Sequence, residues 1–302
     1  MRQNKGRSLN KVIVRIKGGI GNQLFCYAAA RRLALVNDAE LVIDDVTGFA
    51  RDHQYRRGYM LDRFNITARK ATPAERLELF ERYRRGWMKW LSRRKPFVER
   101  LYLERDGMDF DERLLQVKRK GTLYLDGVWQ GEGYFRDVEE VIREDLRIIP
   151  PPDESNQIMS EKIKNCQAVG MHMRWFDAPG NPSAHNVSAD YYKRATALME
   201  ERVDSPHYFV FSDRSDVVPK DLALPSGRTT FVSHNRGDEK AYADLWLMSQ
   251  CRHFIIANST FSWWGAWLAE KWKKIVVCPS DEVQGITWWG FKGLLPDSWI
   301  KS

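Results

Sequence analysis

A hydroxyl-rich and tryptophan-rich segment covers residues 257–267 and reads Ala257-Asn258-Ser259-Thr260-Phe261-Ser262-Trp263-Trp264-Gly265-Ala266-Trp267. Residues 253–257 form a short apolar run, which predicts a buried strand, and residues 263–272 have the apolar periodicity of a helix. Backbone N–H groups in the first turn of a helix have no partner within the helix, so a hydroxyl-rich turn there suits a phosphate. The segment therefore predicts a strand, a helix and, between them, an anion-binding turn formed by Asn258, Ser259, Thr260 and Ser262.

Short apolar runs and helical segments alternate along the rest of the chain. Further strands are expected at residues 12–16, 40–44, 122–127, 168–173, 208–211, 230–232 and 275–277. Further helices are expected at residues 22–36, 74–94, 137–146, 189–201 and 238–249. This alternation predicts an α/β fold in which helices cover parallel sheets.

A proline-rich segment, residues 149–155, divides this pattern into two halves. It is the best linker candidate because proline fits neither a helix interior nor a central strand. A chain of 302 residues is long enough for two domains of about 150 residues each. We therefore predict two Rossmann-like domains, over residues 1–150 and 151–302, whose parallel sheets face a central cleft that binds the ligand.

The first predicted strand is followed by the glycine-rich loop Lys17-Gly18-Gly19-Ile20-Gly21-Asn22-Gln23. Glycines let a backbone approach a ligand closely, and Asn22 is expected to cap the next helix. The loop lacks the Gly-Lys-Ser/Thr of a Walker loop and the spacing of a dinucleotide fingerprint, which Asp44 alone does not restore. A ligand loop through Gly21, Asn22 and Gln23 and a purely structural turn both stay open.

Charged residues follow two predicted strands of the second half, at His172-Met173-Arg174-Trp175-Phe176-Asp177 and at Ser212-Asp213. The guanidinium of Arg174 is suited to a diphosphate, and the alternative is an Arg174–Asp177 ion pair that holds the loop. A carboxylate can accept two N–H bonds from a guanine edge, which makes Asp213 and Asp244 candidate base readers. The alternatives are a loop cap for Asp213 and a charge on a helix surface for Asp244.

Positive charge is concentrated between Arg51 and Arg100, where 15 Lys and Arg stand against 6 Asp and Glu. The helical part of this segment has apolar positions that we interpret as a core stripe: Leu77, Phe80, Trp87, Trp90 and Leu91. One interpretation is a solvated helix face, and the other is attraction to an anionic membrane leaflet or a phosphorylated acceptor. Nucleic acid is not expected, because a core stripe is no stacking platform.

No targeting or membrane-spanning segment is predicted. Residues 1–11 are polar and basic, and no apolar run approaches the length of a membrane span. We expect a cytoplasmic protein, with peripheral contact on the inner face of the cell membrane as an extension of that expectation. The four cysteines lie far apart and beside apolar residues, which favours buried reduced thiols.

Four motifs together resemble the bacterial α-1,2-fucosyltransferases of glycosyltransferase family 11: residues 18–25, His172-x-Arg174-x-x-Asp177, residues 211–213 and the segment 257–267. The resemblance continues to residues 295–300, and its most specific part extends from Asp244 to Trp267. It implies a two-lobed GT-B fold, GDP-fucose as donor, inversion at the fucose anomeric carbon and no metal. The family shows His-x-Arg-Arg-x-Asp, and here Trp175 replaces the second arginine.

The resemblance implies transfer of L-fucose from GDP-β-L-fucose to a hydroxyl of a surface-glycan precursor, such as the 2-OH of a terminal galactoside on a lipid-linked O-antigen oligosaccharide. Without a metal, Arg174 and the helix start would stabilise charge on the leaving phosphate, and Asp177, then His172, are the candidate bases. The expected donor site consists of Gly21, Asn22, Gln23, His172, Arg174, Asp213, Asp244, Asn258, Ser259, Thr260 and Ser262.

Two other functions and one metal-binding motif are alternatives to this interpretation. A non-catalytic sugar-nucleotide or glycan binding module is the first alternative, because Trp175 departs from the family motif. A membrane-surface scaffold acting through residues 51–100 is the second. The motif Asp109-Phe110-Asp111 resembles the D-x-D of metal-dependent glycosyltransferases, but no clear strand precedes it, and the six histidines show no ligand spacing. We therefore predict no metal site.

Overall fold

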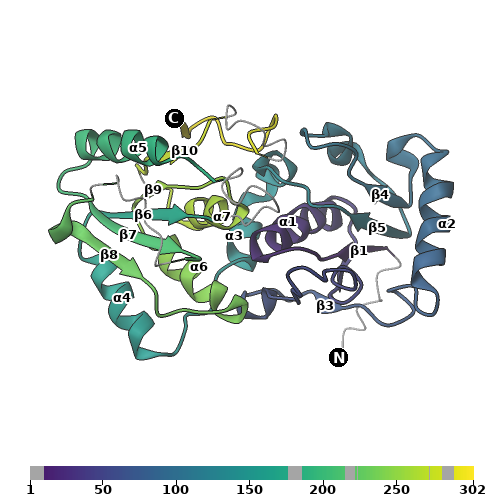
Figure 1. Ribbon diagram of the computed structural model, residues 1–302. Helices are drawn as coiled ribbons and strands as arrows, with labels where there is room; N and C mark the ends of the chain where they lie inside the picture. The colour runs from purple at the N-terminus through teal and green to yellow at the C-terminus, as the bar shows by residue number, and fades with distance from the viewer. Residues whose placement is uncertain (1–9, 176–185, 215–221, 223, 272, 281–288) are drawn as a thin grey trace, which may run out of the picture. The chain divides into compact units, whose positions relative to one another are not determined.

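The computed structural model describes residues 10–175, 186–214, 222, 224–271, 273–280 and 289–302 (Figure 1). The chain divides into two compact units, Met1–Leu146 and Arg147–Ser302, close to the boundary expected at residue 150. Each unit contains one parallel sheet with helices, so the α/β class and the two-sheet organisation are confirmed. The cleft expected between the two sheets stays a prediction.

The first unit contains a five-stranded parallel sheet in the order β3-β2-β1-β5-β4. Its helices and strands are β1 (Lys11–Arg15), α1 (Ile20–Val36), β2 (Glu40–Asp44), β3 (Arg69–Lys70), α2 (Glu81–Arg93), β4 (Tyr102–Glu104), β5 (Thr122–Asp126) and α3 (Glu139–Asp145). The predicted central strands β1, β2 and β5 are confirmed. The strands β3 and β4 have two and three residues, which is too short to show the alternation that predicts a strand.

The core of the first unit lies between β1 and α1. Val12 and Val14 of β1 are fully buried, and α1 buries Leu24 and Phe25 completely. Both faces of a parallel sheet are normally covered, which is why these strands consist of continuous apolar runs. The expected helix over residues 74–94 is shorter than predicted, because α2 begins only at Glu81.

The second unit contains a six-stranded parallel sheet in the order β11-β10-β9-β6-β7-β8. Its helices and strands are α4 (Glu154–Lys164), β6 (Ala168–Met173), α5 (Ala189–Arg202), β7 (His207–Ser212), β8 (Thr229–Val232), α6 (Ala241–Ser249), β9 (His253–Ile255), α7 (Thr260–Leu268), β10 (Val276–Cys278) and β11 (Ile300–Lys301). Helix α4 was not predicted. It starts right after the prolines, where the Asp153 carboxylate accepts a hydrogen bond from the Asn156 N–H at 3.0 Å.

The tryptophans of residues 257–267 pack α7 into the second unit, as expected. Trp263 and Trp264 are fully buried, and Trp267 is almost so. The Trp263 indole N–H donates to the Leu294 carbonyl at 2.9 Å, which satisfies its polar atom. The cysteines are unpaired thiols, and all except the half-buried Cys166 are buried, as predicted. Among the described residues, no helix combines the length and hydropathy needed to cross a bilayer.

Candidate functional site

The carboxyl ends of β6, β7, β8 and β9 lie along one edge of the second sheet, because these strands are parallel. The chain passes from β6 to β7 and β8 and then returns to β9, on the other side of β6. In open α/β sheets, ligands bind outside the carboxyl ends at the point where the strand order reverses. In this sheet that point lies between β6, which ends at Met173, and β9, which leads to Ser259 and α7.

Arg174 and Asp213 stand directly after β6 and β7 and form an ion pair. Arg174 donates from Nη1 to Asp213 Oδ2, and the Trp175 N–H donates to Asp213 Oδ1 at 3.1 Å. The two side chains are 26% and 29% exposed. Because both its oxygens serve this loop, Asp213 positions Arg174, which favours the loop-cap interpretation over guanine reading. The alternative partner Asp177 lies outside the described residues.

His172 is buried in β6, with only 5% of its surface exposed. Burial, together with the charge of Arg174, lowers the pKa of His172 to about 3. Its ring lies 5.2 Å from the ring of Phe261, and its Nδ1 has no hydrogen-bond partner among the described residues. A ring that stays neutral with such a pKa is a poor proton acceptor at neutral pH, so the structure disfavours His172 as the general base. Its orphaned nitrogen suits a contact with a bound ligand.

The turn before α7 uses part of its polar side chains on itself. The Ser259 hydroxyl accepts from the Phe261 N–H at 3.3 Å and caps the helix. Ser262 is fully buried, and its hydroxyl donates to the carbonyl oxygens of Ala257 and Ser259, so its side chain supports the turn rather than a ligand. The Thr260 side chain makes no hydrogen bond within the described residues. Asn258, at the start of the turn, is fully buried, and its ligand role stays a prediction. Thr260 and backbone N–H groups of this helix start are donors that the turn can offer to an anion.

Asp244 lies in the first turn of α6, after β8. Its carboxylate accepts from Asn235 Nδ2 at 2.8 Å, and burial raises its pKa to about 7. This environment contradicts the interpretation of Asp244 as a surface charge. Met248, one turn later on the same face, packs so close to α7 that a Cβ on Gly265 would lie 2.6 Å from its sulfur. Asp244 therefore belongs to the side of α6 that faces α7.

The glycine-rich loop after β1 has a tighter structural basis than predicted. Gly18 has φ +76°, and a Cβ there would lie 2.9 Å from Asn22 Nδ2. The helix α1 begins at Ile20, so its N-cap is Gly19 and not Asn22. Asn22 is half-buried and accepts from Gln130 Nε2 at 3.3 Å, while Gly21 is buried. A ligand role for Gly21 and Asn22 stays a prediction.

Gln23, the third expected ligand residue of this loop, is fully buried. Its Nε2 donates to the carbonyl oxygens of Gly18 and Gly58 at 2.8 and 2.9 Å, and its Oε1 accepts from the Met60 N–H at 2.9 Å. The amide thus ties the loop to residues 58–60. Its hydrogen-bonding capacity is used within the fold, so the structure places Gln23 beneath the loop rather than at a ligand surface.

Replacement of Gln23 by methionine is expected to lower the free energy of unfolding by about 1–3 kcal/mol, because three backbone groups lose their partner in a buried place. Urea unfolding measures this change. Asn22→Ala, at the half-buried neighbour, is the matched variant and should change stability by less than about 0.5 kcal/mol. A Gln23 variant of unchanged stability and weakened donor binding would restore the ligand interpretation.

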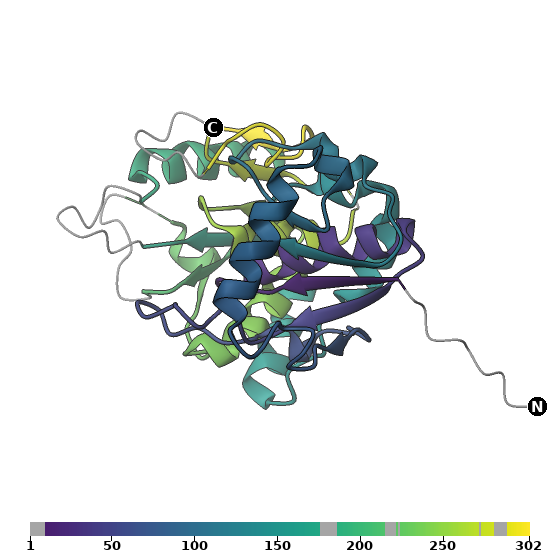
Figure 2. The same cartoon turned by 90° about the vertical axis from the view of Figure 1, so that its right-hand side faces the viewer.

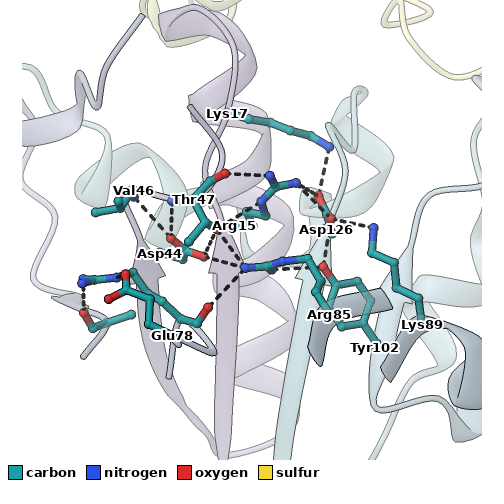
Figure 3. A network of polar contacts seen from close by, with 12 residues as sticks. Arg15, Lys17, Asp44, Val46, Thr47, Glu78, Arg85, Lys89, Tyr102 and Asp126 are labelled. Atoms are coloured by element: carbon teal, nitrogen blue, oxygen red, sulfur yellow. Dashed lines mark hydrogen bonds and ion pairs between the residues drawn. The ribbon is translucent and has the colours of Figure 1, made fainter. Parts of the chain in front are cut away.

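Three charged residues at the ends of β1, β2 and β5 form a second polar cluster, which the sequence analysis missed (Figure 3). Asp126 accepts from Lys17 Nζ at 2.9 Å, from Lys89 Nζ at 3.2 Å and from Arg15 Nη1 at 3.3 Å. Asp44 lies at the end of β2, and Arg85 reaches it from α2 at 3.4 Å. The available signal was that each of these apolar strands ends in a charged residue.

Asp111 of the Asp109–Asp111 motif is engaged with a neighbouring arginine. The Asp111 carboxylate accepts from the Arg113 backbone N–H at 3.1 Å and pairs with the Arg113 guanidinium at 2.7 Å. Within the part of the chain that the structure describes, no group of three or more His, Cys, Asp and Glu side chains is placed to hold a metal ion. Asp111 is therefore a helix-capping residue.

Comparisons with known proteins agree with the architecture. The family described as Glycosyl transferase family 11 matches residues 11–282. The Escherichia coli O-antigen biosynthesis glycosyltransferase WbnK is 31% identical, over 94% of this chain and 98% of the relative. The Escherichia coli alpha-1,2-colitosyltransferase is 28% identical, over 89% and 91%. Arabidopsis thaliana FUT1 in complex with GDP shares the fold, with a TM-score of 0.51, 13% identity and coverage of 89% of this chain and 70% of that one.

The matched family spans both units, from the first residue of β1 to beyond β10, and therefore includes every strand-end residue described above. The architecture is the GT-B type α/β fold that the motifs imply. The family match over residues 11–282 and the 31% identity to WbnK show that the chain belongs to glycosyltransferase family 11.

Proposed function

We propose that this protein is an inverting, metal-independent fucosyltransferase. It transfers L-fucose from GDP-β-L-fucose to a hydroxyl of a surface-glycan precursor, the 2-OH of a terminal galactoside, and releases GDP. One observation carries the proposal: Arg174 and the N-terminus of α7 stand at the two strand ends that flank the switch point of the second sheet. A guanidinium and a helix N-terminus are complementary to a diphosphate.

Departure of GDP leaves negative charge on the β-phosphate while the sugar becomes positively charged. Arg174 and the first N–H groups of α7 would stabilise that charge as it develops, in a place fixed before the reaction. The acceptor hydroxyl must lose a proton, and Asp177 is our candidate for the base. His172, neutral and buried, would instead contact the donor through its Nδ1.

Asp244 is our candidate for the residue that reads the guanine base. Its carboxylate accepts one hydrogen bond from Asn235, which leaves acceptor capacity for the N1–H and N2–H of guanine. Asn235 is itself held by Asn156 at 2.9 Å, so the carboxylate is oriented by an amide network. This assignment separates the two aspartates: Asp213 positions Arg174, and Asp244 binds the base.

The pKa of Asp244 makes GDP binding depend on pH. Burial raises this pKa to about 7 in the free protein, and guanine N–H groups bind only the carboxylate form. GDP affinity should therefore fall about tenfold from pH 8 to pH 6. Calorimetric titration at both pH values measures this. Asp244→Asn retains the ionisation of the nucleotide phosphate and should show weaker binding with a smaller pH dependence. An equal pH dependence in both proteins would contradict the assignment.

GDP-colitose is a second candidate donor, because the chain is 28% identical to an alpha-1,2-colitosyltransferase. Colitose lacks the 3-OH of fucose, so a site that hydrogen-bonds this hydroxyl discriminates strongly against GDP-colitose, whereas an apolar site does not. The ratio of kcat/KM for the two donors decides between them. We expect GDP-fucose to be preferred.

The proposal is tested by incubating the full chain with GDP-fucose and a panel of galactose-terminated oligosaccharides, followed by assignment of the product linkage by NMR. The expected product carries α-linked fucose on O2 of galactose, and one GDP is released for each fucose transferred. The reaction should proceed equally well in excess chelator. A product with β-linked fucose would contradict inversion. Binding of GDP-fucose and of acceptor without GDP release would favour the non-catalytic binding module, and loss of turnover in chelator would reopen a metal site.

A further inference from the structure

Helix α2 is amphipathic with its polar side turned inward. The side that contacts the first unit carries Arg85, Lys89 and Ser92. Arg85 is only 7% exposed and donates to Thr47 Oγ1 at 2.9 Å, and Lys89 pairs with Glu104 at 2.6 Å. These contacts fix the rotation of the helix about its axis. The opposite side therefore faces outward, whatever its side chains are.

The outward side is apolar and aromatic. We define the α2 surface by its exposed apolar residues: Leu79, Phe80, Tyr83, Trp87, Trp90 and Leu91. Tyr83 is 76% and Trp87 60% exposed, and Phe80, Tyr83, Trp87 and Trp90 recur at the spacing of one helical stripe. Figure 2 looks onto α2, and no other segment of the first unit lies in front of it. The expected core stripe is thus wrong: Phe80, Trp87, Trp90 and Leu91 of that stripe are exposed, and only Leu77 is buried.

The α2 surface is surrounded by positive charge. No acidic residue occurs between Glu81 and Glu99, a stretch that contains seven lysines and arginines. Two of these, Arg85 and Lys89, face the fold, and the other five are exposed: Arg82, Arg84, Arg93, Arg94 and Lys95. Of these five, Arg93 also pairs with Glu104 at 3.2 Å, with its side chain 69% exposed. The Arg94 guanidinium lies 3.4 Å from the centre of the Trp90 ring, so the cations border the aromatic side chains directly.

We propose that the α2 surface docks the protein on a bilayer that contains anionic lipid, with the aromatic rings at the headgroup level and the five cations against the phosphates. Tryptophan and tyrosine favour this interfacial region, and an amphipathic helix with basic flanks binds in its plane. The positive charge around the α2 surface decides which partner fits it. A second copy would bring the same cations face to face, and a neutral glycan would not compensate their charge.

The test uses co-sedimentation of the full chain with vesicles of phosphatidylcholine alone or with the anionic lipid phosphatidylglycerol added. Binding is expected only to the anionic vesicles and should weaken at high salt. Arg82→Gln with Lys95→Gln should weaken partitioning about thirtyfold, since each cation contributes about a factor of five. Trp87→Ser with Trp90→Ser should weaken it at least about tenfold.

Matched controls separate the α2 surface from general charge and hydrophobicity. Lys118→Gln with Lys120→Gln removes two exposed lysines of the same unit outside α2, and Ile158→Ser removes an apolar side chain, 63% exposed, on α4. Both controls should bind vesicles like the unchanged protein. Circular dichroism and transfer to a soluble acceptor should be unchanged in all of these variants, so failure of the proposed function is scored separately from failure to bind membrane.

Three results would overturn the proposal. The first is absence of binding to anionic vesicles by the folded protein. The second is equal binding by the α2 variants and their controls. The third is a concentration-dependent dimer in sedimentation velocity that is lost in the Trp87→Ser and Trp90→Ser variant, which would show that a second copy covers the surface.

Discussion

Replacement of Arg174 by alanine is expected to lower kcat for fucosyl transfer by about 10²–10³-fold, the usual effect of removing one preorganised donor from a developing negative charge. The residue stands at the end of β6, and Asp213 holds its guanidinium in place. The loss should appear mainly in kcat, because the charge on the leaving phosphate is greatest in the transition state. Steady-state kinetics with saturating acceptor measures it.

Comparison variants make this result specific. Arg174→Lys keeps the charge but loses the two parallel N–H groups, so it should restore only part of the activity. Asp213→Asn removes the charge that positions Arg174 and should lower kcat less than Arg174→Ala does. The Arg174 side chain is only 26% exposed and is paired with Asp213, so thermal unfolding of Arg174→Ala is measured alongside, and the loss of activity is scored in the folded protein. Full activity in a folded Arg174→Ala protein would remove Arg174 from the mechanism.

Replacement of Asp126 by asparagine is expected to lower the free energy of unfolding by about 3–5 kcal/mol, the cost of breaking a buried ion pair on one side. Asp126 is 5% exposed, and its carboxylate faces Arg15, Lys17 and Lys89 within 3.3 Å (Figure 3). An amide of the same shape would leave these three cations without their common counter-charge. Urea unfolding of the full chain at pH 7 measures the effect on the first unit.

The difference in stability between the unchanged protein and Asp126→Asn should depend on pH, because the Asp126 carboxylate titrates. Burial would raise the pKa of Asp126, but the charges of Lys17, Arg15 and Lys89 outweigh burial and hold it well below its ordinary value. A lowered pKa stabilises the fold above the unfolded pKa of about 4, and this stabilisation is lost as pH falls further. The two proteins should therefore converge in stability in acid.

A surface ion pair of the same unit is the control for Asp126. Asp137 pairs with Arg32 at 2.8 Å, but its side chain is 52% exposed. Asp137→Asn should cost less than about 1 kcal/mol. If Asp126→Asn cost no more than this control, the cluster at the strand ends would be a solvated group of charges rather than a buried support of α2.

The sheets could be predicted because their central strands are continuous apolar runs. Residues 168–173 form β6 as expected, since a fully buried parallel strand needs no alternation. The orientation of α2 could not be predicted in the same way. Its aromatic periodicity indicates a buried stripe, whereas ion pairs of Arg85 and Lys89 with strand-end carboxylates turn that stripe outward. These partners are distant in sequence and meet only in the folded unit.

The candidate functional site could be predicted from the sequence only as far as the ends of the strands could be predicted. Arg174 and Asp213 were placed at neighbouring strand ends, but their pairing depends on β6 lying next to β7, which no local pattern states. Burial then separated ligand candidates from structural residues. It removed Gln23 and the Ser262 side chain from the ligand surface and left His172 neutral.

The pairing of Arg174 with Asp213 has a consequence for the entropy of binding. The guanidinium is anchored through Nη1, and the same carboxylate accepts from the Trp175 N–H, so the loop after β6 is tied to the end of β7 before any ligand arrives. A side chain whose rotamer is already fixed by the fold loses less conformational entropy when an anion binds. Asp213 would therefore contribute to anion affinity through the order it gives Arg174 rather than through a contact of its own.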